Sequence, residues 1–189
     1  MAKHFTTIEP AHADFIARQH IFFTASAAPT GRVNVSPKDA AALRLLNANR
    51  VVYLDVTGSG NETAAHLRLE NRMTMMFCAF EGAPLILRLY GRGRAIARGS
   101  AEYDELLRTH FNNEERPGAR QMILLEVEAV QTSCGYGVPL FDYVSERDTL
   151  TRWAAAKGDD GLREYWQAKN TVSIDGFPTG LVEEETPVA

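Results

Sequence analysis

The stretch MTMMFCAFEGAPLILRLYGRGRAIA, residues 73–97, decides the fold class. Two apolar runs, 73–80 and 85–97, flank the turn EGAP at residues 81–84. Two strand-like runs joined by so short a turn are typical of a β-hairpin, whose strands pair antiparallel. We therefore expect an antiparallel sheet in this part of the chain.

A glycine turn precedes this hairpin in VTGSGNETAAHLRLENR, residues 56–72, and follows the strand-like run VVYLDV at 51–56. Ser59 and Glu62 have the spacing of a capping box, which would explain the turn as the start of a helix without any ligand. A helix start beside glycines also attracts phosphate. A dinucleotide-binding fold is the rival interpretation, but Thr63 replaces its third glycine and the hairpin at 73–97 contradicts its parallel sheet.

The remaining pattern adds strands and a few helices. Residues 20–27 and 32–37 predict a second hairpin joined by APTG, and residues 119–135 predict one long strand. Residues 39–50 fit either a short helix or a loop. Helices are expected at 14–19, 100–111, 145–158 and 162–170. Because antiparallel strands with exposed edges are best closed on themselves, we expect a mainly β protein with a split or closed barrel.

Composition limits the possible functions. The 189 residues are enough for one barrel domain, 1–140, with a helical C-terminal extension, 141–189. No apolar run approaches membrane-spanning length, and the first twenty residues lack a secretory pattern, so we expect a cytoplasmic protein. The net charge of −4 argues against nucleic-acid binding. Cys78 and Cys134 match no metal-binding spacing, and no metal site is predicted.

The order of these elements resembles the pyridoxamine 5′-phosphate oxidase-like family, the FMN-binding split barrels, over residues 14–130. Three segments carry the resemblance: GRVNVSPK at 31–38, YLDVTGSGNETAAHLRLENR at 53–72, and LRLYGRGR at 87–94. The resemblance implies FMN as cofactor, a homodimer with the flavin at the subunit interface, and a small-molecule substrate. It implies hydride transfer through FMN, and leaves open a non-enzymatic protein that binds or senses flavin, deazaflavin or haem.

The resemblance also implies cofactor-binding residues. In the first segment these are Arg32, Asn34, Val35, Ser36 and Lys38; in the other two they are Thr57, Ser59, Asn61, Glu62, Thr63 and Arg88. No catalytic side chain is predicted. Residues 132–143 fit either a wall of the flavin site or a simple loop. His66 is expected at the surface, and Trp166 in packing.

This chain differs from the family at the positions that are expected to bind the FMN phosphate. Many family members carry Ser-Arg-Lys where this sequence has Asn61, Glu62 and Thr63, so the expected phosphate cations are missing. Alternation places Arg88, Arg92 and Arg94 on one face of their strand, either as a replacement or as a solvated surface. Lys38 is a second candidate. The Arg-x-His that binds pyridoxal in the true oxidase is not visible after residue 172, so vitamin B6 oxidation is not expected.

Overall fold

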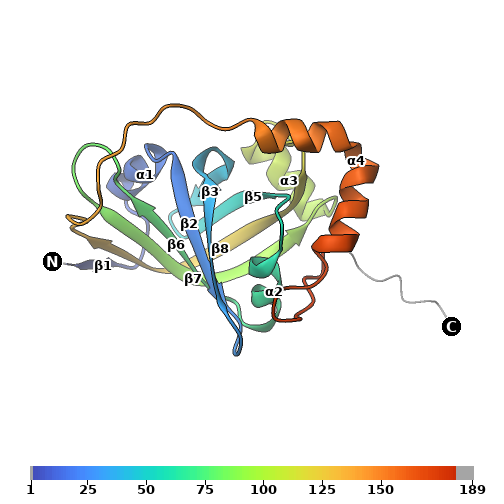
Figure 1. The fold of residues 1–189 in the computed structure, drawn as a ribbon. Helices are drawn as coiled ribbons and strands as arrows, with labels where there is room; N and C mark the ends of the chain where they lie inside the picture. The colour runs from blue at the N-terminus through green and yellow to red at the C-terminus, as the bar shows by residue number, and fades with distance from the viewer. Residues whose placement is uncertain (1, 182–189) are drawn as a thin grey trace.

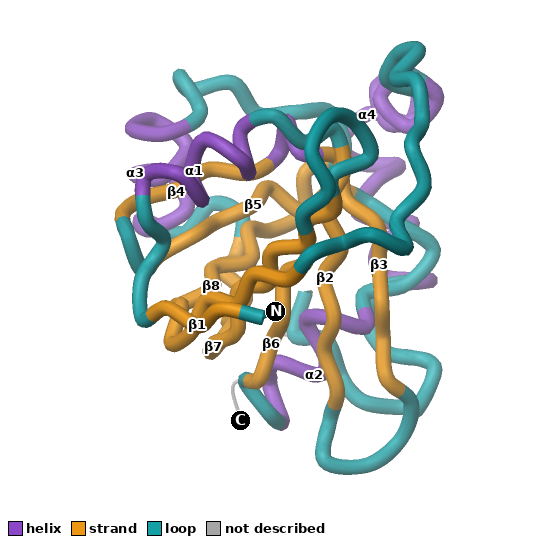
Figure 2. Tube along the Cα trace, turned by 90° about the vertical axis from the view of Figure 1, so that its left-hand side faces the viewer, coloured by secondary structure: helices purple, strands orange, loops and turns teal. Residues whose placement is uncertain are grey.

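The computed structural model describes residues 2–181 and contains an antiparallel sheet of eight strands that curls into a split barrel (Figures 1 and 2). The strand order is β3-β2-β6-β7-β8-β5-β4, with β1 paired to β8. The strands are β1 (Lys3–Phe5), β2 (Ile21–Ala27), β3 (Val33–Asp39), β4 (Leu43–Asn47), β5 (Arg50–Val56), β6 (Arg72–Cys78), β7 (Ile86–Ala97) and β8 (Ala119–Ser133). The predicted antiparallel barrel is confirmed, and the dinucleotide fold is excluded.

The hairpin that decided the fold class is present as β6 and β7. Strand β7 also pairs antiparallel with the long strand β8. The pairing of β7 with β8 shifts register between Tyr90 and Gly91. A Cβ at Gly91 would lie 1.9 Å from the carbonyl oxygen of Glu126, so only glycine allows the two backbones this close approach.

Two sequence expectations about local structure are wrong, and one strand was not foreseen. Residues 43–47 form β4, which pairs antiparallel with β5 through a turn at 48–49, in place of a helix or loop. The first helix, α1 (Pro10–Ala17), begins earlier than predicted, because Glu9 and His12 form a reciprocal cap and Pro10 occupies its first turn. The strand β1 was not predicted.

The core has two main layers, one inside the barrel and one outside it. Inner side chains include Phe22, Tyr53, Phe77 and Leu89. On the outer face, α3 (Ala101–His110) covers a cluster that includes Val52. Strand β5 is therefore buried on both faces, which explains why its sequence is apolar almost throughout.

The C-terminal extension contains two helical segments, as predicted, and they are separated by a non-helical kink at Gly158. Helix α4 (Thr149–Lys169) bends at Gly158, where φ is 65° and ψ is 174°. Its N-cap is Asp148, so the predicted start at Ser145 is wrong. Figure 1 shows a long connection running from the end of β8 across the barrel to α4, which lies outside the sheet.

Within residues 2–181 no helix has the length and hydropathy needed to cross a membrane. The end of the predicted extension, residues 182–189, lies outside the described residues.

Candidate functional site

A cavity of about 890 Å³ lies between β3, the turn from β5 into α2 (Glu62–Leu69), and the segment that follows α4. All but two of the predicted cofactor-binding residues line it: Arg32, Asn34, Ser36, Lys38, Thr57, Ser59, Asn61, Glu62 and Thr63. The fold thus brings together two predicted segments that are separated by some twenty residues in the chain.

Strand β3 presents one polar face to this cavity. Alternation along the strand directs Asn34, Ser36 and Lys38 inward. Asn34 Nδ2 donates to Thr63 Oγ1 of α2 at 3.1 Å, which ties the strand to the helix. Val35 points to the opposite face, is 61% exposed, and does not line the cavity.

Arg88 also lies outside this cavity. It is half-buried on β7, and its Nη1 donates to Ser133 Oγ at 3.4 Å. Alternation correctly predicted that Arg92 and Arg94 share the outward face of β7. Both meet acids there: Arg92 pairs with Glu128 at 2.8 Å and Arg94 with Glu102 at 2.5 Å. These two cations thus belong to a solvated surface.

The start of α2 is open toward the cavity. The predicted capping box is wrong, because the helix begins at Glu62 and its N-cap is Asn61, whose side chain does not cap it. Asn61 Oδ1 instead accepts from Gln121 Nε2 at 2.7 Å. The Glu62 carboxylate accepts from the backbone N–H of Ile174 at 3.1 Å. Within residues 2–181 no side chain therefore caps the first N–H groups of α2, and such groups favour an anion.

A buried carboxylate holds two cations beside this helix start. Asp55, 3% exposed, accepts from Lys38 Nζ at 2.8 Å and from Arg120 Nε at 2.8 Å. Gln121 Nε2 adds a third bond at 2.9 Å. Two positive charges and one negative charge give this triad a net positive charge.

Asp55 is ionised in this arrangement. Burial alone would raise the pKa of its carboxyl group, but the charges of Lys38 and Arg120 outweigh burial and hold the pKa well below its usual range. The ion triad is therefore a permanent feature of the cavity at neutral pH.

Two buried polar atoms on the cavity lining lack partners among the described residues. They are Nδ2 of Asn61 and Nε2 of His66. His66 Nδ1 lies 3.1 Å from Ser26 Oγ, and the side chain is 1% exposed, so the expectation that His66 faces solvent is wrong. Asn61 Nδ2 is a donor only, and an unpartnered buried donor beside an open helix start fits an anionic ligand such as the phosphate of FMN.

The C-terminal extension holds the glycine turn in place. Trp166 Nε1 of α4 donates to Thr57 Oγ1 at 2.7 Å, and Asn170 Nδ2 donates to the carbonyl oxygen of Gly58 at 3.1 Å. Arg120 Nη1 bridges Gly60 O at 2.9 Å and Asn170 Oδ1 at 2.8 Å. Trp166 is buried, as the packing interpretation predicted.

Arg32 is also engaged by this extension. Its backbone N–H donates to Asp175 Oδ2 at 2.7 Å, and its guanidinium pairs with the same carboxylate. The positive charge of Arg32 is therefore paired with the carboxylate of Asp175.

Sequence reasoning missed Asp55, Arg120 and Gln121. The available signal was polarity inside apolar strands: Asp55 interrupts VVYLDV, and Arg120 and Gln121 precede the run MILLEV. Their meeting depends on the pairing of β5 with β8, which sets Asp55 opposite Gln121. That register joins residues some sixty-five positions apart, which no local pattern predicts.

Comparisons with known proteins agree with this architecture. Residues 8–134 match the sequence profile of the pyridoxamine 5′-phosphate oxidase family. A pyridoxamine 5′-phosphate oxidase family protein of Aspergillus flavus, ustO, is 37% identical over 181 residues, which cover 87% of this chain and 72% of that protein.

Solved structures share the fold at low identity. HupZ of Group A Streptococcus has a TM-score of 0.53 at 17% identity, covering 67% of this chain and 99% of that one. A Clostridium acetobutylicum protein related to general stress protein 26, of the pyridoxinephosphate oxidase family, has a TM-score of 0.50 at 11% identity, covering 74% and 94%. The extent of the profile match and the identity to the Aspergillus protein show that this chain belongs to the pyridoxamine 5′-phosphate oxidase family.

Proposed function

We propose that the chain binds FMN in the cavity described above and acts as a flavin-dependent oxidoreductase on a small molecule. The observation that carries this proposal is the open start of α2 beside the triad of Asp55, Lys38 and Arg120. An uncapped helix start and a net positive charge together favour a phosphate dianion.

The chain's own residues have distinct roles in this proposal. Asn61 Nδ2 and the first N–H groups of α2 bind the phosphate, while Lys38 and Arg120 supply the charge that the missing Arg-Lys pair supplies elsewhere in the family. Thr63, Asn34 and Ser36 form a polar row that leads from the phosphate along β3 and orients the remainder of the cofactor. FMN, when bound, supplies the ability to accept and release a hydride.

An absorbance experiment tests this function. The purified protein is titrated with FMN, and a reduced nicotinamide is then added without oxygen. We expect the flavin bands to change on binding and to bleach on addition of the nicotinamide. Binding without bleaching by nicotinamide or any tested donor would identify a non-enzymatic flavin protein, and absence of binding at micromolar FMN would contradict the proposal.

We also propose a homodimer with the flavin at the subunit interface. Strand β3 is an edge of the sheet, and its Val33 and Val35 side chains are 70% and 61% exposed. Val172 and Ile174, at the rim of the cavity, are 51% and 71% exposed. Apolar side chains clustered on an unpaired edge favour burial against another subunit.

The two cysteines support the proposed cytoplasmic location. Cys78 is buried and Cys134 is exposed, and neither forms a disulfide within the described residues. Free thiols are typical of a reducing compartment.

A further inference from the structure

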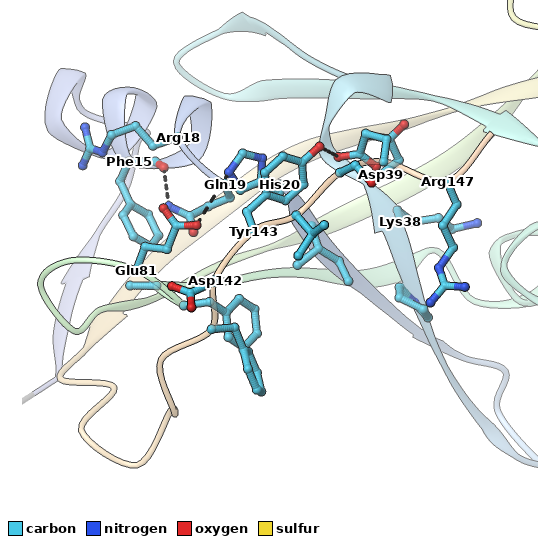
Figure 3. Close-up of a pocket in the computed structure, with 18 of the residues that line it drawn as sticks. Phe15, Arg18, Gln19, His20, Lys38, Asp39, Glu81, Asp142, Tyr143 and Arg147 are labelled. Carbon is cyan, nitrogen blue, oxygen red and sulfur yellow. Dashed lines mark hydrogen bonds and ion pairs between the residues drawn. The ribbon is translucent and has the colours of Figure 1, made fainter.

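A second, larger cavity adjoins the proposed flavin cavity. It has a volume of about 1130 Å³ and shares Pro37, Lys38, Asp39, Val56 and Leu150 with the first one. Lys38 therefore stands on the boundary between the two. Figure 3 shows this residue at one end of the second cavity, and Glu81 and Asp142 at the opposite end.

The connection from β8 to α4 forms one wall of this cavity. The Phe141 N–H donates to the carbonyl oxygen of Phe80 at 2.9 Å, and the two rings lie 5.4 Å apart. Tyr143 stacks on His20 with ring centroids 3.7 Å apart and an interplanar angle of 5°. Aromatic contacts thus fix this connection against the end of the barrel, although Phe141 itself is 60% exposed.

The lining of the cavity is apolar and aromatic, with balanced charge. The apolar members include Phe15, Ile21, Phe80, Leu85, Phe141 and Leu150. The charged members are four bases, Arg18, Lys38, Arg116 and Arg147, and four acids, Asp39, Glu81, Asp142 and Glu146. Two of the bases form ion pairs, Lys38 with Asp55 and Arg116 with Asp39 at 2.5 Å.

We infer that this second cavity binds an uncharged, planar and largely apolar organic molecule next to the cofactor. Flat aromatic walls select a planar ligand, and the equal numbers of acids and bases give the lining no net charge to attract a charged one. Identification of this ligand as the substrate rests on the proposed function, because only a bound flavin at the Lys38 boundary would react with it.

The probe N-phenyl-1-naphthylamine tests the inference, because it is uncharged, aromatic and fluorescent in apolar sites. We expect saturable binding to the protein without added FMN. Replacing the wall residue, Phe141→Ala, should weaken binding about tenfold, since it removes one aromatic ring from the cavity wall. The matched control is Leu140→Ala, because Leu140 is 72% exposed and does not line the cavity. Equal affinities for the wild type and the Phe141→Ala variant would overturn the inference.

A second probe tests the charge of the ligand. 1-Anilinonaphthalene-8-sulfonate has the same ring pair with an added sulfonate, and we expect it to bind more weakly than the neutral probe. Tighter binding of the sulfonate would overturn the assignment of an uncharged ligand.

Adjacency to the flavin is tested separately. Because flavin absorbs in the range where the naphthylamine emits, FMN should quench the emission of the bound probe. Bound FMN without quenching would overturn the placement of the two sites side by side. If FMN fails to bind, the proposed function is wrong. The two probes and the Phe141→Ala variant still test whether the second cavity binds an uncharged aromatic ligand.

Discussion

The ion triad of Asp55, Lys38 and Arg120 has two roles: it stabilises the fold, and it lies at the proposed phosphate site. Arg120 is 4% exposed and lies against Asp55, so removing the carboxylate would leave a buried cation without its partner. The same three side chains stand where the open start of α2 meets the cavity. A residue that keeps the barrel folded is therefore also one that sets the charge of the proposed phosphate site.

The depressed pKa of Asp55 predicts a pH dependence of stability. A carboxyl group whose pKa is lower in the folded state stabilises that state above its unfolded pKa of about 4, and this contribution is lost as the pH falls below that value. Asp55→Asn should lower the free energy of unfolding by about 3–5 kcal/mol at pH 7 and flatten its decline in acid. Urea unfolding at pH 7 and pH 3 measures both effects.

The control for this experiment is Asp160→Asn, because the Asp160 side chain is 96% exposed. It should reproduce the wild-type unfolding curves at both pH values. If the stability of the Asp55→Asn variant falls in acid as steeply as that of the wild type, Asp55 is not the source of the pH dependence.

Replacing Lys38 with methionine tests its role in phosphate binding. Lys38→Met removes one cation while keeping much of the side-chain volume, and a charge-assisted hydrogen bond contributes about 1.5–3 kcal/mol. We expect the affinity for FMN to fall by roughly ten- to a hundredfold, and the affinity for riboflavin, which lacks the phosphate, to change much less. Fluorescence titration measures both. Lys3→Met, at an exposed position on β1, is the control, and equal losses for the two flavins would contradict a phosphate contact.

At the scale of elements, the sequence predicted correctly those strands and helices that depend on residues close together in the chain. The two hairpins, the long β8 and the α3 helix follow directly from apolar runs, turn residues and the Ser100 cap, whose side chain accepts from Tyr103 N at 3.2 Å. Local pattern was not enough for residues 43–47, because Leu and Ala favour a helix there but pairing with β5 makes the segment a strand. It also failed at Ser59, because Asn61 and Glu62 bond to distant partners in place of a cap.

Helix α4 is predicted to stabilise the glycine turn through one hydrogen bond. Trp166→Phe keeps an aromatic ring but removes the Nε1 donor to Thr57. We expect a loss of about 1 kcal/mol in unfolding free energy and a weaker affinity for FMN, because the turn loses one of its tethers. Urea unfolding and FMN titration measure the two effects.

Trp153→Phe is the matched control, since Trp153 packs edge-on against Tyr165 at 5.1 Å on the same helix and does not reach the turn. If both variants bind FMN equally well, α4 does not position the turn.

At the scale of the whole molecule, the exposed valines of β3 predict an association of two chains. Val35→Asp should give a species near the chain mass of 20.9 kDa in sedimentation experiments, whereas the wild type should sediment at about twice that mass. A charge introduced on α2 by Leu69→Asp, at a 48% exposed position, should leave the dimer intact. A wild-type protein that sediments as a single chain would contradict the proposed interface.

The most direct test of the central claim is a comparison of FMN and riboflavin binding to the wild-type protein at equal salt concentration. The arrangement of α2, Asn61 and the Asp55 triad predicts that FMN binds with micromolar or better affinity and clearly more tightly than riboflavin, because only FMN carries the phosphate. Equal affinities, or no binding of either flavin, would contradict a phosphate site at the start of α2.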